Sequence, residues 1–161
     1  MSNNDNFDIE LLKIDEIIIL NALIENNTDL SHLESEKYYF DISYGFSPAI
    51  SVNQKKIRVI FTCNIKLLTL TNEPIDIKGR FELAYFFELE NLEKLVNLEN
   101  TIEINSDLIT SLANISYSTS RGIIYTRCQG TILKKLILPI ISTKKLLDKL
   151  IPKENTNSSD S

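Results

Sequence analysis

The sequence predicts an α+β fold in which the strands of an antiparallel sheet are followed by a long helix and a short C-terminal helix. Three observations predict it. The first half contains four strand-like segments, and most of them alternate apolar and polar residues with a period of two. After Glu90 the spacing of apolar residues becomes helical. A second, shorter helical pattern follows Ser142 and stops at Pro152.

The longest alternation, Ile75–Leu89, has an apolar, aromatic face and a largely charged face, which predicts a strand in a wide sheet with one buried and one wet face. Two alternating runs precede it, Tyr38–Phe46 and Lys56–Leu70, and Pro48 is expected to end or bend the first. In Ile9–Ile24 a run of isoleucines favours a strand over a helix. One face of that strand is expected to carry Leu12, Ile14, Ile18, Leu20, Ala22 and Ile24.

The long helix is expected to begin at Asp107 after a Ser106 cap and to stop near Gly130. Its small residues would let another backbone approach closely. A subunit interface is therefore predicted at Ser116, Thr119, Ser120 and Gly122, with water-facing serines as an equally weighted alternative. Ser142 or Thr143 is expected to cap the short helix, which would run to about Ile151.

Composition indicates one domain, residues 9–151, with disordered polar ends at 1–8 and 152–161. The net charge of −5 argues against nucleic acid as the main partner. The charge is uneven, since the last 41 residues carry +5 and the first 120 carry −10. The basic end would suit an anionic partner, although a solvated helix face is the favoured interpretation.

The chain offers little chemistry for an enzyme. It has no phosphate-binding glycine loop, and its two cysteines give neither a disulfide framework nor zinc spacing. His32 is expected at the surface, and Cys63 and Cys128 are expected to be inert. No catalytic residue, metal or cofactor is predicted. A polar N-terminus and short apolar runs predict a soluble, cytoplasmic protein with no membrane insertion.

The order of these elements carries a resemblance. Four strands precede a long helix containing Ser120-Arg121-Gly122, an apolar loop containing Leu138-Pro139, and a short helix containing Leu146-Leu147. In this order, from about Asp15 to Leu150, the chain resembles the SecB family of export chaperones and its SecB-like relatives. The resemblance implies a four-stranded antiparallel sheet with helices on one side, a dimer of dimers, and no catalysis. It also implies that unfolded polypeptides bind in apolar grooves and pass to the export motor SecA or, in relatives, that an antitoxin is protected.

Apolar residues near loops and helix ends are the candidates for such a groove, with capping of the subunit's own core as the equal alternative. They are Phe46, Ile50, Ile124, Ile132, Leu133, Leu136, Ile140 and Leu147. Four acidic residues of the charged strand face, Asp76, Glu82, Glu88 and Glu90, are candidates for docking a basic partner, although ordinary solvation is favoured.

The leading functional hypothesis is therefore a non-enzymatic holdase for unfolded or nascent chains. The alternatives are a dedicated chaperone of one partner, such as an antitoxin, and a thioesterase of the hot-dog type. The thioesterase would depend on Asp107, the one carboxylate near the helix.

Overall fold

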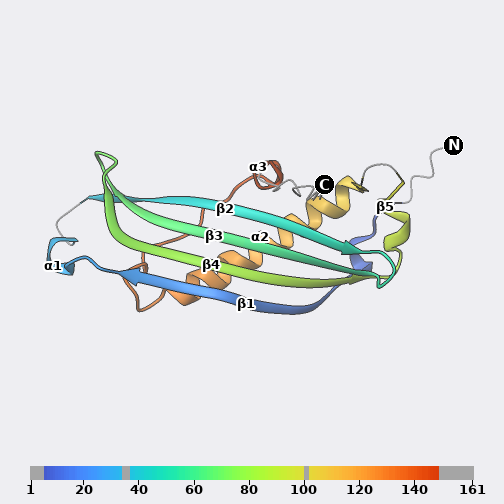
Figure 1. Ribbon diagram of the computed structural model, residues 1–161, viewed down its shortest axis with the longest axis horizontal. Coiled ribbons are helices and arrows are strands. Elements are labelled where there is room, and N and C mark those ends of the chain that lie inside the picture. Colours follow the sequence, from blue (N-terminus) through green and yellow to red (C-terminus); the bar gives the residue numbers. More distant parts are fainter. Residues whose placement is uncertain (1–5, 34–36, 100–101, 149–161) are drawn as a thin grey trace, which may run out of the picture.

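The structure is a computed structural model that describes residues 6–33, 37–99 and 102–148. Its main layer is a four-stranded antiparallel sheet with the spatial order β1-β4-β3-β2 (Figure 1). The strands are long: β1 spans Leu12–Asn26, β2 Tyr38–Ser51, β3 Lys56–Thr69 and β4 Pro74–Leu89. The predicted fold class is confirmed.

The predicted alternation holds in the two central strands. In β3 the residues Ile57, Val59, Phe61, Cys63, Ile65 and Leu67 are all buried. They lie beside the buried residues of β4, because cross-strand partners such as Phe61 and Leu83 share a face. We call this the inner face, since Tyr85 on it reaches the long helix. The opposite, outer face carries the charged residues of both strands.

The predicted face of β1 is wrong in part. The strand contains two irregularities, between Ile14 and Glu16 and between Ile19 and Asn21, each of which inserts one residue. An inserted residue shifts all later side chains to the opposite face. Ile18 therefore pairs with Ala84 on the outer face, while Ile17 and Ile19 pair with Tyr85 and Leu83 on the inner face.

Pro48 neither ends nor interrupts its strand. β2 continues to Ser51, and Pro48 lies opposite Val59 in an unbroken register. β2 is an edge strand of the sheet, so one side of its backbone needs no partner, and a proline lacking an N–H is tolerated there.

The long helix α2, Ser106–Cys128, crosses the inner face obliquely (Figure 1). Asn105, rather than the expected Ser106, is its cap, and the Asn105 side chain accepts hydrogen bonds from the backbone N–H groups of Asp107 and Leu108. Gly130 follows the helix with a positive φ of 76°. The buried residues of α2 are Leu108, Leu112, Ala113, Ser116, Tyr117, Ser120, Ile124 and Cys128.

After α2 the chain returns along the helix. Residues 131–142, which we call the return segment, form no regular helix or strand. The Ser142 side chain then caps the short helix α3, Thr143–Leu147, which contacts α2 and β2. The predicted continuation of α3 to Ile151 lies outside the described residues.

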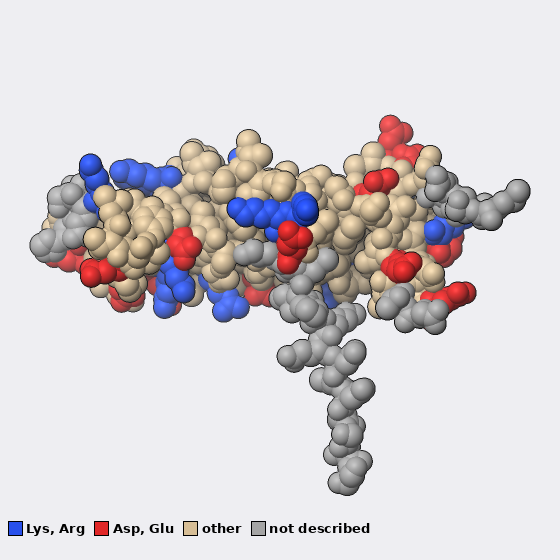
Figure 2. All heavy atoms as spheres, turned by 90° about the horizontal axis from the view of Figure 1, so that it is seen from above, with Lys and Arg blue, Asp and Glu red and all other residues tan. Residues whose placement is uncertain are grey.

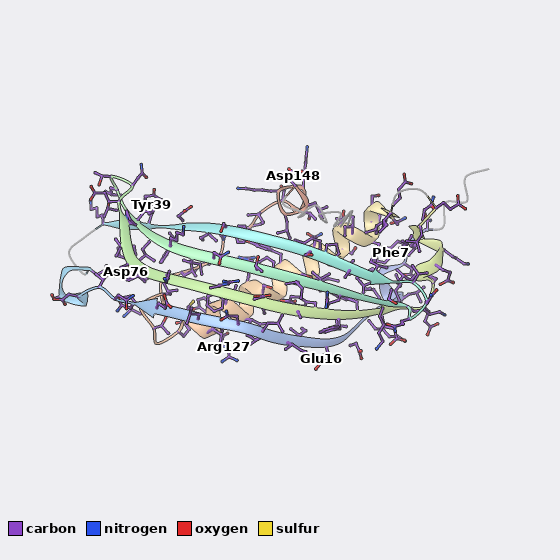
Figure 3. The ribbon with its side chains drawn as sticks, viewed as in Figure 1. Phe7, Glu16, Tyr39, Asp76, Arg127 and Asp148 are labelled. Carbon is purple, nitrogen blue, oxygen red and sulfur yellow. The ribbon has the colours of Figure 1, made fainter. Side chains whose placement is uncertain are left out.

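The smaller elements lie at the two ends of the sheet. They are a 3₁₀ turn at Ile9–Leu11, the helix α1 at Leu30–Leu33, a 3₁₀ turn at Leu92–Lys94, and the short strands β5, Val96–Asn97, and β6, Glu103–Ile104. Phe7 packs against the core near β5 (Figure 3). The rest of the predicted N-terminal tail up to Asp5, and the tail 152–161, lie outside the described residues. No helix among the described residues has the length and apolar character needed to cross a membrane.

Candidate functional site

The eight predicted polypeptide-binding residues divide into two groups. Phe46, Ile124, Leu133 and Leu136 are almost fully buried in the subunit's own core. Ile50, Ile132 and Leu147 are half-buried at its margin, whereas Ile140 is 87% exposed. The four buried residues cannot touch a foreign polypeptide in this conformation, so the site must be built from the other four and their neighbours.

The return segment places Ile140 at the surface and holds it there. Tyr117 of α2 donates a hydrogen bond of 2.7 Å to the carbonyl oxygen of Pro139. One helical turn later, the Arg121 Nε donates to the carbonyl oxygen of Leu138 at 3.1 Å. Arg121 and Leu138, two of the residues on which the resemblance rests, are therefore in direct contact.

Apolar side chains anchor the same segment from below. Leu133, Leu136 and Leu138 are buried, and Leu133 lies so close over Gly79 of β4 that a Cβ there would stand 2.8 Å from its Cδ1 atom. Between these anchors Ile137 points outward and is 69% exposed. The result is an ordered segment with two exposed isoleucines, Ile137 and Ile140.

A second set of exposed apolar residues lies on the edge strand β1. Ile14, Ile17, Leu20 and Leu23, the β1 edge set, are all exposed. Ile14 and Ile17 lie on the inner face and Leu23 on the outer face, and Leu20 is an inserted residue. The period-two pattern predicts apolar positions at Ile14 and Leu20, but it predicts neither the exposure of the β1 edge set nor that of Ile137. Ile137 could have been found, since the buried Leu136 and Leu138 flank it in a period-two pattern. The exposure of the β1 edge set could not, because the two inserted residues change the face on which the later side chains lie.

The predicted subunit-interface residues do not share one surface. Ser120 is buried and hydrogen-bonds to Tyr85, with their hydroxyl oxygens 2.5 Å apart. Ser116 is also buried against the sheet. Thr119 is half-buried and Gly122 is exposed, with open space where its Cβ would be. Only Thr119 and Gly122 are therefore open to a second subunit.

The predicted acidic docking face is balanced by cations. Lys13 lies 3.9 Å from Glu90, and Arg80 lies 3.9 Å from Glu82. Glu88 pairs in register with Lys13 and Lys56 on the two neighbouring strands. Figure 3 shows the fourth residue, Asp76, near the N-terminal end of β4, away from the end that carries Glu88. The outer face therefore has mixed charge rather than an acidic surface.

Two hollows formed by described residues lie elsewhere on the sheet. One, of about 360 Å³, is lined by residues that include Lys66, Pro74 and Lys78. The other, of about 240 Å³, is lined by residues that include Leu23 and Arg80. No predicted polypeptide-binding residue lines either hollow.

The titratable groups in the core are held in their neutral forms. Burial raises the pKa of Cys63 to about 12 and that of Cys128 to about 11, so both thiols stay protonated at neutral pH and are poor nucleophiles. Asp107, the candidate of the thioesterase alternative, is exposed in the first turn of α2. Among the described residues, no group of three or more His, Cys, Asp or Glu side chains could hold a metal ion.

Comparison with solved structures assigns the fold. The chain matches the Mycobacterium tuberculosis Rv1957 SecB-like chaperone, solved in complex with a ChAD peptide from the Rv1956 HigA1 antitoxin. The TM-score is 0.57 at 15% identity, and the match covers 83% of this chain and 93% of that one. The fold is SecB-like.

A Streptococcus agalactiae protein of unknown function is also similar, at a TM-score of 0.40 and 9% identity over 81% of this chain and 96% of that one. No protein-family model matches the sequence, and no curated protein matches it. The SecB-like likeness is therefore one of fold.

Proposed function

We propose that the protein is a non-enzymatic chaperone, a holdase that binds unfolded or nascent polypeptides. The observation that carries this proposal is the ordered exposure of Ile137 and Ile140 on the return segment. Apolar side chains that the subunit anchors but does not cover are typical of an interaction site. Burying one such side chain contributes roughly 1.5–3 kcal/mol and requires no particular hydrogen-bond pattern in the client.

A dedicated partner is the variant of this function that the comparison favours over export. The SecB-like neighbour was solved with a peptide from an antitoxin. Delivery to the export motor SecA rests on the sequence resemblance alone. One dedicated client, such as an antitoxin, is therefore the second candidate beside general holding of unfolded chains.

We also propose that the protein works in the cytoplasm as a homo-oligomer, a dimer of dimers. Both cysteines are free and buried, which suits a reducing compartment. The exposed apolar residues of the β1 edge set lie along an unpaired sheet edge, where a second copy would cover them. Size-exclusion chromatography with light scattering should give a mass about four times the 18.4 kDa of one chain. A strict monomer would contradict this part of the proposal.

The holdase activity is tested by light scattering from an aggregating client. We expect the protein to suppress scattering from a reduced, unfolded client without nucleotide. Ile137→Ser/Ile140→Ser should weaken the suppression several-fold. The control is Leu70→Ser, which removes another exposed apolar side chain, 66% accessible, from the β3–β4 turn. Unchanged scattering with wild-type protein in several-fold excess would refute the holdase proposal.

Affinity capture from the native host separates the two client types. One protein recovered in stoichiometric amount supports the dedicated chaperone. A broad mixture of nascent chains supports the general holdase.

A further inference from the structure

Positive charge is concentrated on the side of the molecule that carries the return segment. Residues 121–148 contain six lysines and arginines and one carboxylate, Asp148. Five of these cations are exposed: Arg127, Lys134, Lys135, Lys144 and Lys145. Figure 2 shows a group of lysine or arginine side chains over the middle of the molecule with an acidic side chain beside it, and further basic side chains toward one end. The net charge of −5 therefore hides a locally basic surface.

These cations differ from four cations of the sheet in their surroundings, although Arg58 and Lys66 of β3 also have no carboxylate within 4 Å among the described residues. On the sheet Lys13, Lys56, Lys78 and Arg80 each have a carboxylate within 4 Å, the closest being Glu25 at 2.8 Å from Lys78. Within the described part of the chain, no carboxylate lies within 4 Å of any of the five exposed cations named above. Their charge is therefore available to a partner.

The spacing of the free lysines matches the exposed isoleucines. Lys134 and Lys135 precede Ile137, and Lys144 and Lys145 follow Ile140. The nine steps along the chain from Lys135 to Lys144 span at most about 30 Å if fully extended, at roughly 3.3 Å per residue. The surface thus presents two apolar contacts with a pair of positive charges at each end.

We propose that the return segment selects clients in which a short apolar stretch is flanked by aspartate or glutamate. This inference rests on the proposed holdase function and names the class of client. The isoleucines supply apolar contact that tolerates many sequences. The lysine pairs attract acidic flanks and repel basic ones, which adds specificity and speeds association. The attraction acts over about 10 Å at 0.1 M salt, so the acidic residues must border the apolar stretch directly.

The test uses three fluorescein-labelled peptides of twelve residues with the same central apolar stretch. Their flanks are Glu-Glu, Gln-Gln or Lys-Lys, and binding to the full-length protein is followed by anisotropy. At 50 mM salt we expect the Glu-flanked peptide to bind at least tenfold more tightly than the Lys-flanked one. At 300 mM salt the difference should shrink several-fold.

Charge reversal locates the effect. Lys134→Glu/Lys135→Glu/Lys144→Glu/Lys145→Glu should invert the preference and favour the Lys-flanked peptide. The control, Lys13→Glu/Lys56→Glu/Lys66→Glu/Lys78→Glu, makes the same change in net charge on the sheet and should keep the preference for the Glu flanks. Circular dichroism confirms that both variants are folded before they are compared.

Four outcomes would overturn the inference. In the first, the three peptides bind equally, and in the second, the sheet control loses the preference as fully as the lysine variant. In the third, the lysine variant changes the oligomeric mass and leaves peptide binding intact, which assigns the surface to a second copy. In the fourth, the protein binds vesicles of phosphatidylcholine with 30% phosphatidylserine but not the Glu-flanked peptide. If the peptides bind equally while client scattering is still suppressed, the holdase function stands without this client preference. If no peptide binds and scattering is unchanged, both fail.

Discussion

The hydrogen bond between Tyr85 and Ser120 fixes α2 on the sheet, and its removal gives a quantitative prediction. Both residues are completely buried, and their hydroxyl oxygens lie 2.5 Å apart. Desolvation raises the pKa of Tyr85 to about 12, in keeping with its apolar surroundings. Because the sequence placed Ser120 in a subunit interface, the same experiment tests its reassignment to the interior.

The magnitude depends on which partner is removed. Ser120→Ala leaves the buried Tyr85 hydroxyl without its partner, which costs about 1–3 kcal/mol. Tyr85→Phe should cost less, about 0.5–1.5 kcal/mol, because a helical serine can turn to the carbonyl four residues before it. The double variant should be no less stable than Ser120→Ala, since it leaves no tyrosine hydroxyl to desolvate. The two single effects should therefore not add, and the coupling should be about 1 kcal/mol.

Urea unfolding of the wild type and the three variants measures the coupling, with equal m-values as the condition for comparison. Additive losses, within about 0.3 kcal/mol, would show that the two hydroxyls do not interact. A Ser120→Ala variant of unchanged stability but altered oligomeric mass would refute the interior assignment and restore the interface.

Three further predictions follow from single positions. Gly79→Ala should destabilise the protein by about 1–3 kcal/mol in urea unfolding, because its Cβ would meet the Leu133 side chain at 2.8 Å. Gly122→Ala, with open space around it on α2, should stabilise the protein by about 0.5–1 kcal/mol. Changes in unfolding free energy of the same sign for the two variants would contradict this packing. Tyr117→Phe should speed amide hydrogen exchange across residues 138–141, since it removes the hydrogen bond to the carbonyl oxygen of Pro139. Unchanged exchange rates would show that this bond does not order the return segment. Burial raises the pKa of Cys63 to about 12, so above about pH 9 only the unfolded state loses this thiol proton, and stability falls as pH rises, by about 1.4 kcal/mol at pH 10. Cys63→Ala should reduce this slope between pH 8 and 10 to the part that Cys128 contributes, and an equal slope would assign the loss to other groups.

The sheet was predictable because the period-two pattern is local. In β3 and β4 each inward residue could be named from the sequence, since the pairing between them is unbroken over most of its length. In β1 the same reasoning failed for Ile18 and Leu20. Whether a strand contains an inserted residue depends on its partner strand, here β4, and the sequence of β1 alone does not show it.

The candidate site was harder to predict because it lies on a segment without regular structure. Leu133 and Leu136 were expected in a groove, yet they are buried because Gly79 and the rest of the inner face leave room for them. Ile137 was overlooked although its neighbours on both sides point inward. The direction of the side chains in the return segment is set by the hydrogen bonds that Tyr117 and Arg121 donate to its carbonyl oxygens. The accepting residues, Pro139 and Leu138, lie 22 and 17 residues away in the sequence.

Site-specific photo-crosslinking tests the role of the return segment most directly. A benzoylphenylalanine at position 140, in place of Ile140, would be irradiated while an unfolded client is held. The same residue at position 70, in place of the exposed Leu70, would serve as the comparison. Strong client adducts from position 140 and few from position 70 are predicted. Equal yields at the two positions, or adducts only from position 70, would contradict client binding at this surface.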